Sequence, residues 1–356
     1  MLLTDTRRNL FRSLESAAIP AAVIEKLASI GVTTLDELRD LWTYGNRALI
    51  SQFLGDSPLR FVSASPAALI ATRGSGSGSS PILSLADLGR AAPLVKHPRG
   101  AKLVLSQRQL TASTPEPIAA TRAARPSTRP AVSLIDQFPA IRHQKSRSTC
   151  VAFASAAWFE FHRDQLSGTA NRRHSEQFLY WGCKQIDGVA NEEGTWLKFA
   201  RQVVKRQGVC LNSTWPYNPL PIAGNESQDP PPANAIEEAK QFKATSQKLA
   251  PKTAKLRQAL DAGRPVVLTV ATFASWDFAV PFQTGEIIMP LPGELSDGGH
   301  AICVVGYEIN PRLPGGGAFI IRNSWGTAFG KQGRFAPGYG TLFFDYINKY
   351  GSEAFA

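Results

Sequence analysis

The spacing of hydrophobic positions changes along this chain. In the first 56 residues apolar side chains recur at helical spacing, in three short runs divided at Gly31 and ending at Gly55. Pro20 is suited to the start of the first run, and Thr34-Leu35-Asp36-Glu37 has the order of a capping box that opens the second. This pattern predicts a small module of three helices over residues 1–56.

Farther along the chain, helical spacing is followed by apolar runs typical of buried strands. Residues 150–163 contain no Pro or Gly and are apolar on most faces, which predicts a buried helix. Ser175 should cap a second helix, and a third should begin near Trp196 and end at Gly208. A helix is expected over 253–262, and strands are expected over 264–270 and 318–322.

Three separate segments carry residue types that suit catalysis by a thiol. Cys150 would lie at the N-terminus of the helix 150–163, where the helix dipole lowers a thiol pKa. His300 stands in Gly-Gly-His-Ala, and Asn323 opens Asn-Ser-Trp-Gly. Each residue alone could be structural: a core cysteine, a core histidine and a turn asparagine. Together, in this order, they indicate a thiol hydrolase whose catalytic residues meet only in the fold.

These motifs, with Gln144 six residues before Cys150, resemble the papain family of cysteine proteases over roughly residues 131–356. The resemblance implies that His300 pairs with the Cys150 thiolate and then protonates the leaving amine. It implies that Asn323 orients the imidazole ring. Gln144 would hold the developing oxyanion together with the backbone N–H of the cysteine.

The resemblance also implies residues that contact or shield the substrate. Gly194 matches the glycine whose backbone pairs with the substrate backbone, and a side chain there would block close approach. Trp325 would shield the histidine–asparagine hydrogen bond from water. Ala301 and Phe273 would line part of the main side-chain pocket, which suggests an apolar preference.

The fold that this family implies is α+β with two lobes. A helical left lobe would begin at Cys150, a β-sheet right lobe would carry His300 and Asn323, and the small all-α module would precede both. The implied activity is peptide-bond hydrolysis through an acyl-thioester, with no metal or organic cofactor and with a peptide or protein as substrate. Two alternatives stay open: a transferase or deconjugating enzyme with the same triad, and an idle binding module that acts through its helical N-terminus.

The chain departs from the family pattern near the nucleophile. Arg147 stands where the family usually has a disulfide-bonded cysteine, and its charge could help to hold Cys150 ionised. The tryptophan that usually follows the nucleophile is Val151 here. The four cysteines form no C-x-x-C pair, although a Cys183–Cys210 bridge stays open. So few cysteines in 356 residues fit a reducing compartment.

Residues 57–130 are basic and contain a flexible Gly/Ser tract at 73–80. Between residues 88 and 130 there are eight basic side chains and one acidic one, a net charge of +7 that accounts for most of the chain's +11. This stretch could be a solvated linker, a site for an acidic partner, or a pro-segment that lies across the cleft. The charged motif of the family's helical pro-regions is absent from it.

The N-terminal module resembles helix-hairpin-helix modules over residues 27–38, some of which bind DNA. Docking to protein, or simple packing, is favoured over nucleic acid because the pattern is short. No apolar stretch is long enough for a transmembrane helix, and the N-terminus lacks the apolar region of a secretory signal. We therefore expect a cytoplasmic protein without membrane contact, while export by a dedicated secretion machine stays open.

Overall fold

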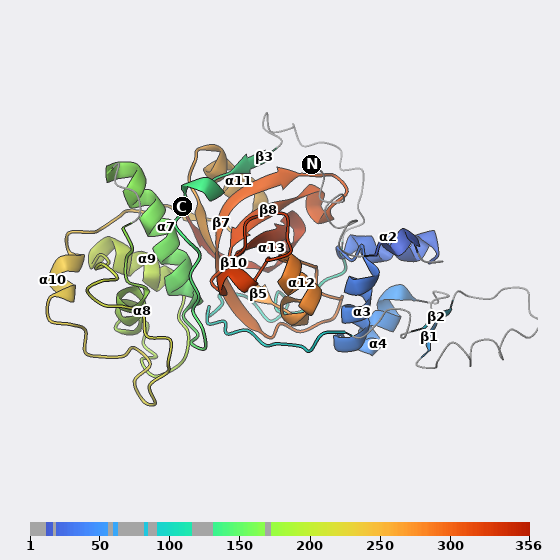
Figure 1. Ribbon diagram of the computed structural model, residues 1–356, viewed down its shortest axis with the longest axis horizontal. Helices are drawn as coiled ribbons and strands as arrows, with labels where there is room; N and C mark the ends of the chain where they lie inside the picture. Colours follow the sequence, from blue (N-terminus) through green and yellow to red (C-terminus); the bar gives the residue numbers. More distant parts are fainter. Residues whose placement is uncertain are drawn as a thin grey trace, which may run out of the picture.

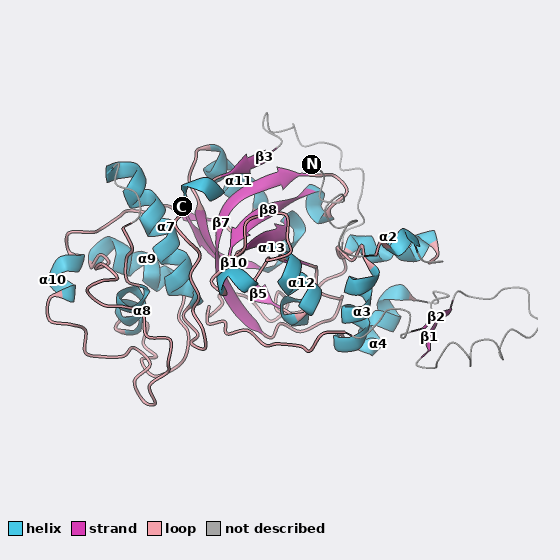
Figure 2. Cartoon of the chain, viewed as in Figure 1, coloured by secondary structure: helices cyan, strands magenta, loops and turns pink. Residues whose placement is uncertain are grey.

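The structure is a computed structural model that describes residues 12–16, 19–55, 60–62, 82–84, 91–115, 131–167 and 172–356. Helices gather at one end, a curved sheet forms the centre, and a second group of helices lies beside the sheet at the other end (Figure 1). The secondary-structure colouring shows the same separation, with the large sheet in the central lobe (Figure 2). The α+β, two-lobed fold expected from the sequence is confirmed.

The left lobe is built around helix α7 (Cys150–Ser167), which is buried continuously from Cys150 to Phe161. A helix that is apolar on most faces is stable only inside the protein, so α7 packs between the sheet and the other helices of its lobe. Those helices are α8 (Glu176–Lys184), α9 (Leu197–Arg206) and α10 (Ala235–Ala239). The Ser175 hydroxyl accepts the N–H of Phe178 at 2.9 Å, the cap that the sequence predicts for α8.

A buried ionic group connects the start of the domain to the left lobe. The Arg142 guanidinium lies 2.6 Å from the Glu160 carboxylate on α7 and 2.8 Å from the Glu176 carboxylate on α8. Both carboxylates are almost fully buried, so loss of the arginine would leave two unpaired charges in the interior. This group fixes the orientation of α7 relative to α8.

The right lobe is a sheet whose long central strand is β7 (Gly298–Ile309). Its antiparallel neighbours are β5 (Val266–Thr272) and β8 (Gly317–Arg322). The remaining strands are β3 (Ala131–Ser133), β4 (Lys248–Leu249), β6 (Glu286–Ile287), β9 (Tyr339–Phe343) and β10 (Gly351–Phe355). The helices of this lobe are α11 (Thr253–Asp261), α12 (Ala279–Thr284) and α13 (Phe344–Tyr350), with short 3-10 turns η2 (Ile135–Gln137), η3 (Ala274–Asp277), η4 (Pro314–Gly316) and η5 (Gly326–Ala328).

The N-terminal module contains the helices that the sequence predicts. After the short turn η1 (Leu14–Ser16) they are α2 (Ala21–Ser29), α3 (Leu35–Tyr44) and α4 (Arg47–Leu54), and the capping box between Thr34 and Glu37 is present. The module packs on the right lobe: the Asp40 carboxylate accepts the N–H of Val280 at 2.8 Å, and the Ile30 carbonyl accepts that of Met289 at 2.9 Å. Two short strands, β1 (Arg60–Val62) and β2 (Ile82–Ser84), pair in parallel.

Candidate active site

Cys150 is the first residue of α7 and is fully buried at the junction of the two lobes. The backbone N–H of Ala301, on β7, donates to the Cys150 Sγ at 3.4 Å. Burial raises the pKa of the thiol to about 12, although backbone N–H groups, including those of Ala301 and Ala101, oppose the shift. In this closed arrangement desolvation outweighs the helix N-terminus, and the thiol is neutral.

His300 lies on β7 opposite Val270, and its Nε2 is 2.8 Å from the Oδ1 of Asn323, which follows β8. The Ser324 backbone N–H also donates to this oxygen at 2.7 Å, which fixes the orientation of the amide. Because Oδ1 can only accept, Nε2 carries the ring hydrogen and Nδ1 is left as an acceptor. Nδ1 is buried and has no hydrogen-bond partner within the described residues. Burial also lowers the pKa of His300 to about 3, so the ring is neutral.

The Trp325 ring packs against His300, and the shielding of the histidine–asparagine hydrogen bond that the resemblance implies stays a prediction. The Trp325 ring centroid lies 4.7 Å from that of His300, and the Trp276 ring packs against both. The indole N–H of Trp325 donates to the Pro98 carbonyl at 3.0 Å.

Gln144 is held so that its amide nitrogen faces the cleft. Its Oε1 accepts the Ser324 hydroxyl at 2.6 Å, and its Nε2 donates to the Arg147 carbonyl at 2.9 Å. The same nitrogen lies 3.5 Å from the Arg99 carbonyl oxygen. A backbone carbonyl therefore lies beside the donor that the sequence assigns to the oxyanion.

Residues 97–103 cross the cleft in extended form and bond to both lobes. On the right lobe, the N–H groups of Gly100 and Ala101 donate to the Gly299 carbonyl at 3.2 and 3.1 Å. On the left lobe, the Thr195 N–H donates to the Gly100 carbonyl and the Lys102 N–H donates to the Thr195 carbonyl, each at 2.9 Å. The strand runs parallel to Thr195, with the Ala101 N–H near the Cys150 sulfur.

Glycines make this close approach possible. Gly100 has φ +141°, and a Cβ there would overlap the Ser148 carbonyl. A Cβ on Gly194 would overlap Gly100, and one on Gly299 would overlap Ala101 and Leu103.

Thr195 is the residue whose backbone pairs with the segment in the cleft. The neighbouring Gly194 N–H donates to the Tyr180 hydroxyl at 2.9 Å, and its carbonyl accepts the Lys184 ammonium at 3.0 Å. The expected pairing of Gly194 with a substrate backbone stays a prediction. Phe273 packs against Tyr346 and Tyr350, and its expected place in a substrate pocket stays a prediction.

The interpretation of Arg147 as a cation near the cleft is wrong. Its guanidinium donates to the Gln177 side chain at 2.7 Å and to two backbone carbonyls inside the left lobe, and it lies over the Tyr180 and Tyr217 rings. This polar network stands at the position of the family's disulfide.

All four cysteines are free and buried, so the Cys183–Cys210 bridge that the sequence left open is not formed. The cytoplasmic location expected from the sequence stays a prediction. Within the described part of the chain, no helix is both long and apolar enough to cross a membrane.

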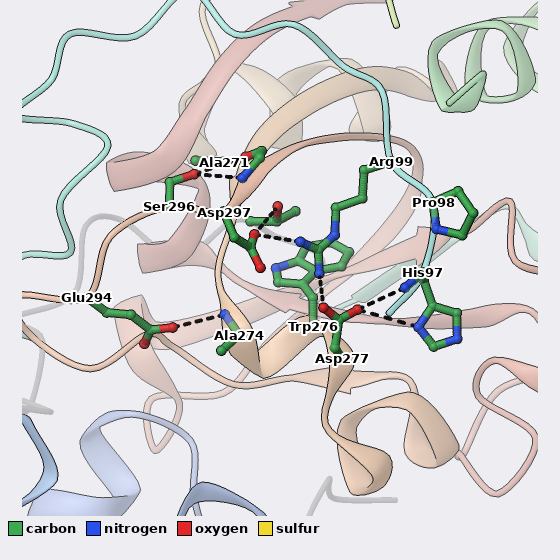
Figure 3. Close-up of polar contacts among 12 residues, drawn as sticks. His97, Pro98, Arg99, Ala271, Ala274, Trp276, Asp277, Glu294, Ser296 and Asp297 are labelled. Carbon is green, nitrogen blue, oxygen red and sulfur yellow. Dashed lines mark hydrogen bonds and ion pairs between the residues drawn. The ribbon is translucent and has the colours of Figure 1, made fainter. Parts of the chain in front are cut away.

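The sequence analysis missed a second polar group at the cleft, formed by Asp277 and Asp297 around Arg99 (Figure 3). Asp297 stands three residues before His300 in Asp-Gly-Gly-His, and that proximity was an available signal. Asp277 ends η3 and carries no local signature.

Comparison with known proteins agrees with this geometry. Residues 133–341 match the model of the papain family cysteine protease. A curated relative, the uncharacterized peptidase C1-like protein L477 of Acanthamoeba polyphaga mimivirus, is 27% identical over 202 residues, which are 54% of this chain and 62% of that protein. The chain thus spans less than two thirds of that relative.

Among solved structures, xylellain, a cysteine protease from Xylella fastidiosa, is similar with a TM-score of 0.57 and 24% identity, over 74% of this chain and 98% of xylellain. At that identity the likeness shows the fold alone. The family match extends over more than half of the chain and includes the segments of Cys150, His300 and Asn323. The chain belongs to the papain family of cysteine proteases.

Proposed function

We propose that this chain is a cysteine peptidase in which Cys150 is the nucleophile, His300 the acid–base residue and Asn323 the residue that orients it. The observation that carries the proposal is the convergence of three distant segments. Cys150 at the start of α7 touches β7 through the Ala301 N–H, and β7 also carries the histidine that is hydrogen-bonded to Asn323. The Nδ1 of His300 is left as an acceptor, as proton transfer from a thiol requires.

The chemistry follows from these roles. His300 Nδ1 takes the Cys150 proton, and the thiolate attacks the carbonyl carbon of the scissile peptide bond. The Gln144 Nε2 and the Cys150 N–H stabilise the oxyanion. The imidazolium then protonates the leaving amine, and a thioester remains. Water attacks the thioester while His300 accepts its proton, the carboxylic acid product leaves, and the thiol is restored.

Residues 91–115 support the pro-segment reading of the basic region. They lie against both lobes, place an N–H near the Cys150 sulfur and put the Arg99 carbonyl beside Gln144. A substrate would need to present a carbonyl carbon to the sulfur, whereas the segment directs the Ala101 N–H toward it. We propose that it keeps residues 131–356 inactive until it is displaced.

The closed cleft also accounts for the neutral catalytic pair. Burial raises the pKa of Cys150 and lowers that of His300, and both shifts oppose a thiolate–imidazolium pair. Displacement of the segment would admit water, restore the solvation of the thiolate and let the helix N-terminus act on the sulfur.

The helical module supports the closed state from outside the cleft. The Tyr44 hydroxyl donates to the Ala92 carbonyl at 2.5 Å, at the beginning of the segment. The N–H groups at the hairpin, on Ile30, Gly31 and Val32, all donate to carbonyls of α2. We propose that the module binds the protease domain of its own chain, because these N–H groups are already used and nucleic acid would need them.

The experiment uses one substitution that displaces the segment from the full-length chain. Gly100→Val should do so, because any Cβ at this position overlaps the Ser148 carbonyl. A thiol-directed epoxide should then label Cys150, identified by mass spectrometry, and peptides should be hydrolysed. Gln107→Val, at an exposed position of the same segment, should leave the chain as slow as the unmodified one.

The same labelling and hydrolysis should vanish in Cys150→Ala combined with Gly100→Val. A Gly100→Val chain that is folded, yet neither labels at Cys150 nor cleaves peptides, would contradict the proposed function.

A further inference from the structure

Arg99 enters a pocket of two carboxylates beside the catalytic histidine. Its Nη2 lies 2.7 Å from the Asp277 Oδ2, and its Nη1 lies 2.5 Å from the Asp297 Oδ1. The carboxylates come from different segments, η3 and the turn before β7, and contact the guanidinium from two sides (Figure 3). Thr272 Oγ1 donates to the Asp297 carboxylate at 2.8 Å and fixes its position.

Within the described residues, the basic side chains that contact these carboxylates come from the segment in the cleft. They are Arg99 for both carboxylates and the His97 ring, 3.5 Å from the Asp277 Oδ1. Burial would raise the pKa of Asp277, but the hydrogen bond with His97 and the charge of Arg99 outweigh it and hold that pKa below its usual value. When the segment leaves, both carboxylates lose the guanidinium that they contact, which favours a cationic ligand.

The position of this pair relative to the nucleophile indicates which part of a ligand it would contact. Asp297 precedes His300 by three residues, and the neighbouring Pro98 carbonyl is bonded to Trp325. The other arm of the segment pairs with Thr195 on the opposite lobe. The carboxylates therefore lie on the histidine side of the cleft, where the proposed mechanism puts the leaving amine.

We propose that Asp277 and Asp297 form a subsite for an arginine side chain of the substrate, on the leaving-group side of the scissile bond, and that Arg99 fills it in the closed protein. This inference rests on the proposed function. Arginine fits better than lysine because two separate nitrogens of one planar group meet two carboxylates, whereas an ammonium is a point charge.

Binding tests the subsite without turnover. In the full-length Arg99→Ala chain, N-acetyl-arginine methylamide should bind at least about tenfold more tightly than its neutral citrulline counterpart, as one charge-assisted pair would give. Asp277→Asn and Asp297→Asn together should abolish the difference. Glu192→Gln, which removes a carboxylate on the opposite side of the cleft, should preserve it. Equal affinity for the two ligands before the two aspartate changes would overturn the subsite.

Cleavage tests the role in substrate choice. The Arg99→Ala, Gly100→Val chain should cleave peptides with arginine on the leaving-group side with a kcat/KM about tenfold above that for citrulline peptides. Asp277→Asn and Asp297→Asn together should bring the ratio to about one. Equal cleavage would mean that the carboxylates only hold the segment. If neither peptide is cleaved and Cys150 is not labelled, the proposed function fails, and the binding comparison decides the subsite by itself.

Discussion

At the scale of single residues, the two ring nitrogens of His300 have different roles. Nδ1 is the acceptor in proton transfer, whereas Nε2 is hydrogen-bonded to Asn323, which orients the ring. In the Gly100→Val background, His300→Ala should abolish peptide hydrolysis, because no other base lies in the proposed proton path. Asn323→Ala should be milder, since the asparagine orients the ring and does not carry the proton. Steady-state kinetics on the Gly100→Val chain, and on that chain with either His300→Ala or Asn323→Ala, would check the order of the two losses in activity. A larger loss in Asn323→Ala than in His300→Ala would contradict these roles.

Asp277 is the residue whose ionisation should set how the closed state responds to acid. Its pKa is depressed in the folded protein, so its stabilising contribution is fully present above about pH 4, the ordinary pKa of aspartate, and is lost as pH falls through the lower folded value. The melting temperature of the full-length chain should exceed that of Asp277→Asn by roughly 2–4 °C for each kcal/mol lost. This gap should persist from pH 7 to pH 5 and should close in stronger acid. A gap that already closes between pH 7 and pH 5 would show that another group controls the segment.

At the scale of elements, the end of α8 determines where the left lobe meets the cleft. The Lys184 ammonium is fully buried and lies 2.9 Å from Asp187, 2.8 Å from the Glu192 carbonyl and 3.0 Å from that of Gly194. Asp187 in turn accepts the Thr195 hydroxyl at 2.9 Å. One lysine thus holds the loop that presents the Thr195 backbone to the segment in the cleft.

Lys184→Met should therefore destabilise the full-length chain by about 3–5 kcal/mol, because it leaves the Asp187 charge buried and unpaired. With Gly100→Val it should also raise KM more than it lowers kcat, since the loop contacts the substrate backbone and not the sulfur. Lys240→Met removes a lysine from a similar i,i+3 pair that is largely exposed, and should change the melting temperature little. Equal losses in the two variants would refute the role of the buried pair.

At the scale of the whole molecule, residues 91–115 lie against both lobes of the same chain and cross its cleft. A shortened chain that begins at Ala131 should cleave peptides faster than the full-length chain, and a peptide of residues 91–115 should inhibit it. The same peptide with Gly100→Val should not inhibit. Salt should weaken the inhibition only in part, because the ion pairs to Asp277, Asp297 and Glu192 are screened while the backbone hydrogen bonds are not. Equal rates for the two chains, with no inhibition by the peptide, would rule out the pro-segment.

The local spacing of residues along the sequence was sufficient to predict helices and their caps. The three helices of the module, the capping box at Thr34, the cap at Ser175 and the buried helix that begins at Cys150 depend on residues within a few positions of one another. A hydrophobic period or a cap acts over one or two turns, so each is readable from the sequence. The motifs around Cys150, His300 and Asn323 likewise indicated the family, because each has a recognisable neighbourhood.

What only the tertiary structure decided concerns groups that meet from distant parts of the chain. Arg99 and Asp277 are separated by 178 residues along the sequence, and nothing near either residue indicates the other. The orientation of Arg147 into the left lobe and the pairing of Thr195 with the segment depend on which polar groups the packed lobe leaves unsatisfied. The neutral thiol of Cys150 is set by burial, which the sequence around a residue does not contain. The local order of residues determines helices and strands. Tertiary packing determines which side chains become partners and how far each is exposed to solvent, and therefore whether an ionisable group is charged.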